Sequence, residues 1–149
     1  MPVAYLGLGC NLGDRRANCL NAVRLLKDKG ITVTKESSLY ETEPWGYKEQ
    51  SAFINMAVEI KTDMSPRELL VNLKDIERKM GRIETARWGP RLIDIDILLY
   101  DDLILDEPDL VIPHPLMHKR DFILQPLSEI APDVIHPVLN KRIRDLLGY

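Results

Sequence analysis

The order of six patterned segments within residues 1–100 is the feature that most constrains the fold of this chain. Apolar, β-branched runs that suit strands alternate with segments whose apolar residues recur at helical spacing. The predicted order is strand, helix, strand, strand, helix, strand. The strands are expected at residues 3–8, 31–40, 53–60 and 92–100, and the helices at residues 14–30 and 65–81.

Both predicted helices carry their own start and stop signals. Asp14 can cap the first helix and Gly30 can end it. Ser65 and Pro66 open the second, and Glu68 completes a capping box. The element order predicts an α+β, ferredoxin-like βαββαβ fold with both helices on one face of an antiparallel sheet. The expected buried stripes are Ala17, Leu20, Val23, Leu25 and Leu26 in the first helix, and Leu69, Leu70, Leu73, Ile76 and Met80 in the second.

The remaining segments predict irregular structure. Residues 41–50 combine a proline, a glycine and two aromatic residues, which is typical of a loop. The proline-rich segment after residue 100 predicts turns and short elements, with a helical turn or two near residues 141–147. A length of 149 residues suits one domain, so we expect residues 1–149 to form a single domain.

Composition narrows the class of partner. A formal net charge of -3 argues against a protein that holds nucleic acid electrostatically. No apolar run is long enough to cross a bilayer, and the first residues lack the layout of a signal peptide, so we expect a cytoplasmic protein without a membrane partner. Cys10 and Cys19 are too few for a disulfide framework and lack the spacing of a metal site. We expect a monomer.

Two aspartates interrupt the apolar run of the last predicted strand. Side chains two residues apart share a face of a strand, so Asp94 and Asp96 should stand side by side while Ile93, Ile95 and Ile97 face the helices. Neighbouring carboxylates repel unless positive charge is supplied, and Mg²⁺ prefers carboxylate, water and phosphate oxygens. The pattern indicates a magnesium site, although a solvent-facing strand surface would show the same alternation.

Three arginines, Arg82, Arg87 and Arg91, lie immediately before the aspartates, with Trp88 among them. A guanidinium presents a planar fork of donors that matches phosphate oxygens. A single arginine here would be typical of a surface loop paired with acidic neighbours. The whole cluster beside two acidic residues favours polyphosphate binding.

The glycine-rich start, GLGCNLGD, is less informative. It lacks the Gly-Lys-Ser/Thr ending of a P-loop and the complete dinucleotide-binding pattern. We therefore interpret Gly7, Gly9 and Gly13 as strand-end and turn residues that allow close packing.

Aromatic and histidine segments indicate a small-molecule site. Residues 42–47 with Phe53 and Asn55 could form an aromatic pocket for a flat heterocycle, although each aromatic alone is also typical of a core or a loop cap. His114 and His118 are spaced as zinc ligands, but an intervening proline and the lack of a third ligand argue against zinc. Hydrogen bonding to a phosphate or ribose is a better use of them.

The stretches YLGLGCNLGD, ETEPWGYKEQSAFIN, GRIETARWGPRLIDIDILLY, IPHP and RDFILQPLSEIAP together resemble the 6-hydroxymethyl-7,8-dihydropterin pyrophosphokinases of folate biosynthesis. They occur in the same order and cover nearly the whole chain. The resemblance implies a ferredoxin-like, ATP-dependent diphosphotransferase that moves the diphosphate of ATP onto the hydroxymethyl group of the pterin and releases AMP. The alternatives are a non-catalytic nucleotide-sensing module on the same fold and a different transferase that uses the aspartate pair.

The resemblance also implies site residues by position. Two Mg²⁺ ions would be held by Asp94 and Asp96. The same aspartates would act in catalysis together with Arg82, Arg91 and Trp88. ATP would be bound by Lys74, Glu77, Ile97, His114 and Arg120. The pterin would be bound by Thr42, Pro44, Trp45, Phe53, Asn55 and Phe122. Departures from the family pattern are Cys10 in place of a serine, Phe53 in place of a tyrosine, and Glu84 where arginine is often found.

Overall fold

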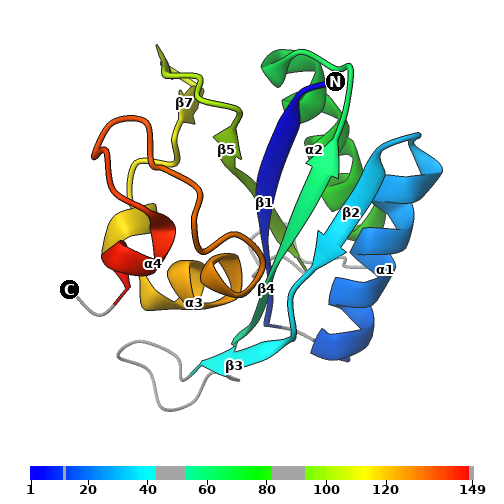
Figure 1. Cartoon of the computed structure of the whole chain (residues 1–149). Coiled ribbons are helices and arrows are strands. Elements are labelled where there is room, and N and C mark those ends of the chain that lie inside the picture. The colour runs from blue at the N-terminus through cyan, green and yellow to red at the C-terminus, as the bar shows by residue number, and fades with distance from the viewer. Residues whose placement is uncertain (12, 43–52, 82–92, 148–149) are drawn as a thin grey trace.

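The computed structural model describes the chain except residues 12, 43–52, 82–92 and 148–149 (Figure 1). Within the described part, neighbouring strands of the main sheet run antiparallel in the order β2-β4-β1-β5, and β3 pairs with β4. This order and connection confirm the predicted ferredoxin-like βαββαβ arrangement. The strands are β1 (Val3–Cys10), β2 (Thr32–Glu36), β3 (Tyr40–Thr42), β4 (Phe53–Lys61) and β5 (Asp94–Tyr100).

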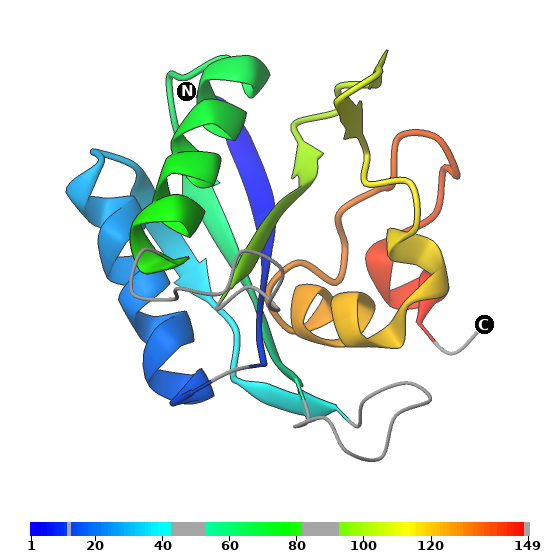
Figure 2. The same cartoon turned by 180° about the vertical axis from the view of Figure 1, so that it is seen from behind.

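Helices α1 (Arg15–Asp28) and α2 (Pro66–Gly81) pack on one face of the sheet, as predicted (Figures 1 and 2). Asp14 caps α1 through its side chain. The capping box of α2 is reciprocal: the Ser65 N–H donates to Glu68 Oε1 at 3.1 Å, and the Glu68 N–H donates to Ser65 Oγ at 3.2 Å. Both helix starts therefore form where the sequence placed them.

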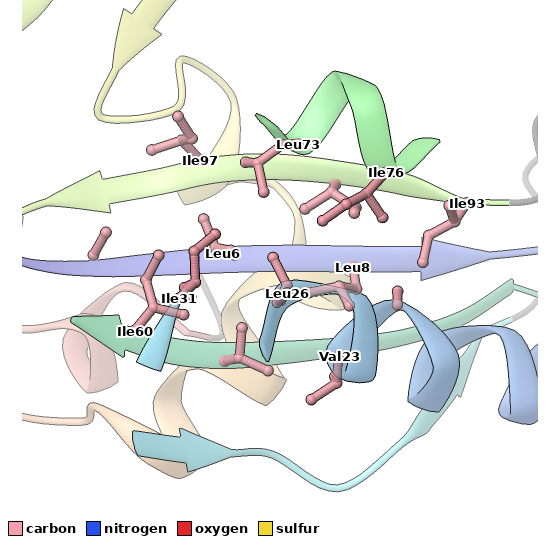
Figure 3. Close-up of a cluster of buried hydrophobic side chains, with 14 of the residues drawn as sticks. Leu6, Leu8, Val23, Leu26, Ile31, Ile60, Leu73, Ile76, Ile93 and Ile97 are labelled. Atoms are coloured by element: carbon pink, nitrogen blue, oxygen red, sulfur yellow. The ribbon is translucent and has the colours of Figure 1, made fainter. Parts of the chain in front are cut away.

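The core between these helices and the sheet is built from alternate strand residues and one stripe of each helix (Figure 3). In α2 the predicted stripe is confirmed, except that Leu70 is only partly buried. In α1 the prediction is partly wrong, because Leu20 is 53% exposed and Ala17 also faces solvent. The α1 stripe follows i, i+3, i+4, i+7 spacing through smaller residues, which a search for large apolar residues misses. Its members are Cys19, Ala22, Val23 and Leu26.

The opposite face of the sheet is covered by α3 (Asp121–Ile130), and α4 (Ile143–Leu146) packs against α3 (Figure 2). The sequence predicted turns and short elements here, and α3 contradicts that prediction with ten helical residues. Pro126 lies inside α3, where it removes one helical hydrogen bond, and this is why the sequence indicated a break. Apolar burial offsets the lost bond, since Leu124 and Leu127 are fully buried against the sheet.

The predicted strand at 31–40 is two strands, because the chain bends at residues 37–39. At the bend, the Ser37 side-chain oxygen accepts a hydrogen bond from the Ala57 N–H at 2.8 Å, in place of a backbone partner. After β5 come a hairpin of β6 (Leu105–Glu107) and β7 (Leu110–Ile112) and a single turn, η1 (Met117–Lys119). None of the helices in the described part of the chain has the length and apolar character of a membrane span.

Candidate active site

The sheet face opposite α1 and α2 holds a cavity of about 830 Å³ between the strands and the start of α3. The cavity is lined by β1, β4 and β5 on one side and by residues 116–123 on the other. It brings together residues that lie up to 116 positions apart in the chain, from Gly7 to Ile123. Predicted site residues on its lining are Phe53, Asn55, Asp94, Asp96, Arg120 and Phe122.

Strand β1 forms the floor of the cavity, between the residues predicted to bind the pterin on β4 and those predicted to bind metal on β5. Gly9 pairs with Asn55 on β4 and with Asp94 on β5. Gly7 lies one row along and pairs with Asp96. Paired residues present their side chains on the same face, so the amide and the two carboxylates share one surface with only glycine between them.

The interpretation of these glycines as strand-end and turn residues is wrong for Gly7 and Gly9, which lie inside β1. A Cβ on Gly9 would lie 3.0 Å from Asn55 Oδ1, and a Cβ on Gly7 would lie 3.3 Å from a methyl carbon of Leu98. The absence of side chains therefore keeps the floor open. The sequence carried a signal for this open floor, because the G-x-G pattern of residues 7–9 within a strand places both glycines on one face of the sheet.

The two aspartates occupy one face of the edge strand, as predicted. Asp94 and Asp96 are exposed, while Ile93, Ile95 and Ile97 are buried. In the part of the chain that the structure describes, no group of three or more His, Cys, Asp or Glu side chains could hold a metal alone. Two carboxylates at an open cavity fit Mg²⁺, which keeps water and substrate phosphate oxygens in its shell, better than a closed structural zinc site.

His114 lies against the outer edge of β5. Its backbone N–H donates to the Leu98 carbonyl at 3.0 Å, and its Nδ1 accepts the Leu116 N–H at 3.2 Å. Burial lowers the pKa of His114, Arg120 lowers it further, and Asp96 opposes the shift. The imidazole is therefore neutral near pH 7, with its proton on Nε2 available to a ligand.

Arg120 and Phe122 line the cavity wall opposite the strands. The guanidinium carbon of Arg120 lies 5.7 Å from the centre of the Phe122 ring, within cation–π range. Phe53 faces the same cavity from β4. The two rings predicted to enclose the pterin thus belong to opposite walls of one cavity.

Four predicted nucleotide residues lie apart from the cavity lining, and His114, at the outer edge of β5, is one of them. Lys74 and Glu77 are on α2, on the far side of the sheet, and pair with each other at 3.3 Å. Glu77 Oε2 also accepts the Ile95 N–H at 2.8 Å. Ile97 turns its side chain into the helix-side core, so only its backbone is placed to meet a ligand.

Six predicted site residues remain. Thr42 belongs to β3 and pairs with Phe53 through the backbone. The other five lie outside the described residues and are Pro44, Trp45, Arg82, Trp88 and Arg91.

Sequence reasoning missed several residues near the cavity. Leu116 just before η1, Lys119 at the end of η1 and Asp121 at the start of α3 line it, and no local pattern indicates this. Asn11, just beyond β1, is 6% exposed, and its Oδ1 has no hydrogen-bond partner in the described part of the chain. A buried acceptor without a partner is costly, so the Asn11 side chain is unusual for a buried polar group.

Comparison with known proteins decides the family. Residues 5–132 match the family described as 7,8-dihydro-6-hydroxymethylpterin-pyrophosphokinase (HPPK). The chain belongs to the HPPK family. The sequence of this HPPK-family chain is 44% identical over 145 residues to the 2-amino-4-hydroxy-6-hydroxymethyldihydropteridine pyrophosphokinase of Aquifex aeolicus (strain VF5), spanning 97% of the chain and 90% of that protein. The enzyme of the same name from Bacillus subtilis (strain 168) is 49% identical over 133 residues, spanning 89% and 80%.

A solved structure confirms the fold independently of the sequence. The Plasmodium falciparum HPPK-DHPS A437G with STZ-DHP superposes on this HPPK-family chain with a TM-score of 0.76 at 22% identity. The match covers 97% of this chain but only 44% of that one, so the chain spans less than half of the Plasmodium protein. The resemblance seen in the sequence motifs and the ferredoxin-like fold are both confirmed.

Proposed function

We propose that this chain transfers the diphosphate of ATP onto the hydroxymethyl oxygen of 6-hydroxymethyl-7,8-dihydropterin in folate biosynthesis and releases AMP. The observation that carries the proposal is one cavity in which Asn55 and Asp94 flank Gly9 on three neighbouring strands. Membership of the HPPK family supports the same activity. A non-catalytic nucleotide sensor is not favoured, because it would not need the second, aromatic half of the cavity. The single domain over residues 1–149, the monomeric state and the cytoplasmic location stay predictions.

The aromatic half suits a pterin. Asn55 is 8% exposed, and its amide can both donate and accept hydrogen bonds, which matches the edge of a pterin ring. Phe53 and Phe122 would stack on the two faces of the ring from opposite walls. Backbone groups of Thr42, Pro44 and Trp45 are proposed to complete this pocket.

The acidic half suits metal-bound phosphates. Asp94 and Asp96 are proposed to hold two Mg²⁺ ions together with water and phosphate oxygens. When bound, Mg²⁺ would neutralise charge on the triphosphate and on the two carboxylates. This pairing explains why two anions can stand side by side on the strand.

The nucleotide is proposed to lie along the outer edge of β5. The Ile95 N–H points outward, and the backbone N–H and C=O of Ile97, two residues further along this strand, are proposed to bind the base. The Nε2–H of His114 can donate to a phosphate or ribose oxygen, and Arg120 adds a positive charge at the cavity wall. Arg82, Arg91 and Trp88 are proposed to close over the triphosphate, with Lys74 nearby.

The chemistry requires positioning more than covalent participation. The hydroxymethyl oxygen forms a bond to the β-phosphorus, the bond from that phosphorus to the α,β-bridging oxygen breaks, and the hydroxyl proton passes to solvent. AMP keeps the bridging oxygen. The chain's residues hold the pterin against the floor, orient the triphosphate for in-line attack and offset its charge. No nucleophilic side chain takes part.

The decisive experiment incubates the protein with ATP, Mg²⁺ and the hydroxymethyl dihydropterin and resolves the products by chromatography. We expect AMP and the pterin diphosphate in equal amounts, and no AMP when the pterin is left out. A nucleotide sensor would give no AMP in either reaction. Release of inorganic diphosphate or a nucleoside diphosphate would instead identify another class of transferase.

A further inference from the structure

We propose that Glu77 is a positioning residue that holds strand β5 in place for Asp94 and Asp96, and that it does not itself bind ATP. The proposal refines the proposed function, since it concerns the strand that carries the acidic pair. The observation behind it is a side-chain-to-backbone hydrogen bond of 2.8 Å from the Ile95 N–H to Glu77 Oε2.

The location of this bond gives it its effect. Within the residues that the structure describes, β5 is an edge strand, and only β1 holds it through a strand ladder. Ile95 lies between Asp94 and Asp96, and its side chain is buried toward α2 while theirs face the cavity. A bond at the Ile95 N–H therefore fixes the outer edge of the strand at the centre of the acidic pair.

The helix that supplies Glu77 is itself held firmly. The capping box fixes the start of α2, and Arg67 binds Asp109 of the segment joining β6 and β7 at 2.8 Å. Glu77 thus connects β5 to a helix that is capped at its start and tied to the segment joining β6 and β7.

The environment of Glu77 suits a structural carboxylate. Its side chain is only 8% exposed, and its second oxygen lies 3.3 Å from Lys74 Nζ. A carboxylate directed at a triphosphate would repel it, whereas one that accepts a backbone N–H stabilises the strand beneath the binding site. Lys74 compensates the charge of Glu77 while its own side chain stays 47% exposed.

The test compares Glu77→Gln, which keeps an oxygen acceptor, with Glu77→Met, which removes it at similar volume. Asp75→Asn is the matched control, because this neighbour on α2 pairs with Lys29 and Lys79 and not with β5. Amide hydrogen exchange at Ile95 is measured by NMR on the ligand-free protein. The Mg²⁺ concentration for half-maximal turnover and the pterin KM are then measured for each variant.

In Glu77→Met we expect Ile95 exchange to accelerate by about tenfold or more, as for a lost bond to a charged group. The Mg²⁺ requirement should rise by about tenfold, while the pterin KM moves by less than about threefold. Glu77→Gln should stay within about threefold of the unsubstituted chain on every measure, and so should Asp75→Asn. Rescue by glutamine identifies the acceptor, not the charge, as the functional group.

Two results would overturn the proposal. One is unchanged Ile95 exchange in Glu77→Met. The other is a Glu77→Gln variant whose Mg²⁺ requirement rises as much as that of Glu77→Met while the Ile95 amide stays protected from exchange. That result would mark Glu77 as a direct ligand. The exchange measurement needs no turnover, so it still decides the role of Glu77 if the unsubstituted chain forms no AMP and the proposed function fails.

Discussion

At the scale of single residues, Gly9 separates the two proposed halves of the site, since an amide stands on one side of it and a carboxylate on the other. Asn55 and Asp94 both pair with this glycine across the sheet. We therefore expect that substitutions can change the proposed binding of the ring and the proposed binding of the phosphates independently.

Asp96→Asn tests the acidic side, because it keeps the side-chain volume and removes one charge. We expect the single-turnover rate of AMP formation to fall by at least about 10²-fold, while pterin affinity changes by less than about threefold. Asp106→Asn, an exposed carboxylate on the β6–β7 hairpin, should alter neither. Near-normal turnover of Asp96→Asn at saturating Mg²⁺ would contradict the role of Asp96.

Gly9→Ala tests the floor. Its new methyl group would lie 3.0 Å from Asn55 Oδ1 and displace the amide, so we expect the pterin KM to rise by about tenfold. In Gly7→Ala the new methyl group meets the flexible end of the Leu98 side chain at 3.3 Å, so the pterin KM should rise by less. Steady-state kinetics of the two variants give the comparison, and an equal effect would show that the contact with Asn55 is unimportant.

At the scale of elements, the capping box shows how α2 is fixed without touching the cavity. Ser65→Ala removes the acceptor for the Glu68 N–H, and we expect the free energy of unfolding to fall by about 1 kcal/mol. Ser65→Thr keeps a hydroxyl acceptor, so its free energy of unfolding should fall by less. Urea unfolding measures both, and pterin KM should not move, because α2 packs on the face opposite the cavity. A raised KM in Ser65→Ala would mean that the start of α2 shapes the site.

Local patterns predicted the parts of the fold and site that depend on neighbours in the chain. The facing of Asp94 and Asp96 follows from strand alternation, and the same rule applied to Gly7 and Gly9 would have placed the floor. Helix α3 could not be predicted in this way, because Pro126 indicates a break and only packing on the sheet reverses that preference. The cavity wall at residues 116–121 depends on where α3 docks, so it had no local signal.

At the scale of the whole molecule, stability should fall on mild acidification. Buried His136 accepts the Val138 and Leu139 N–H groups at 3.3 and 3.1 Å through Nδ1, which requires an unprotonated ring. Burial lowers its pKa, and His118 lowers it further. The unfolded chain therefore binds more protons below about pH 6.5, and the free energy of unfolding decreases as pH falls from there toward the folded pKa.

Urea unfolding between pH 7.5 and pH 5 measures this dependence. His136→Asn offers an oxygen near the position of Nδ1 and does not titrate, so its stability should depend less on pH. The free energy of unfolding of His136→Asn should still depend on pH to some extent, because the pKa of His114 is also lowered. An identical pH dependence in the two proteins would exclude His136 as a source of the acid destabilisation.

The glycine floor of β1 has a consequence for inhibition. A flat compound lying on Gly7 and Gly9 would touch main-chain atoms, which a missense change cannot remove. Resistance at these two positions could arise only by adding bulk, and the added carbon of Gly9 would crowd the amide of Asn55, which is proposed to bind the natural substrate. Escape from such a drug would thus carry its own penalty for folate supply.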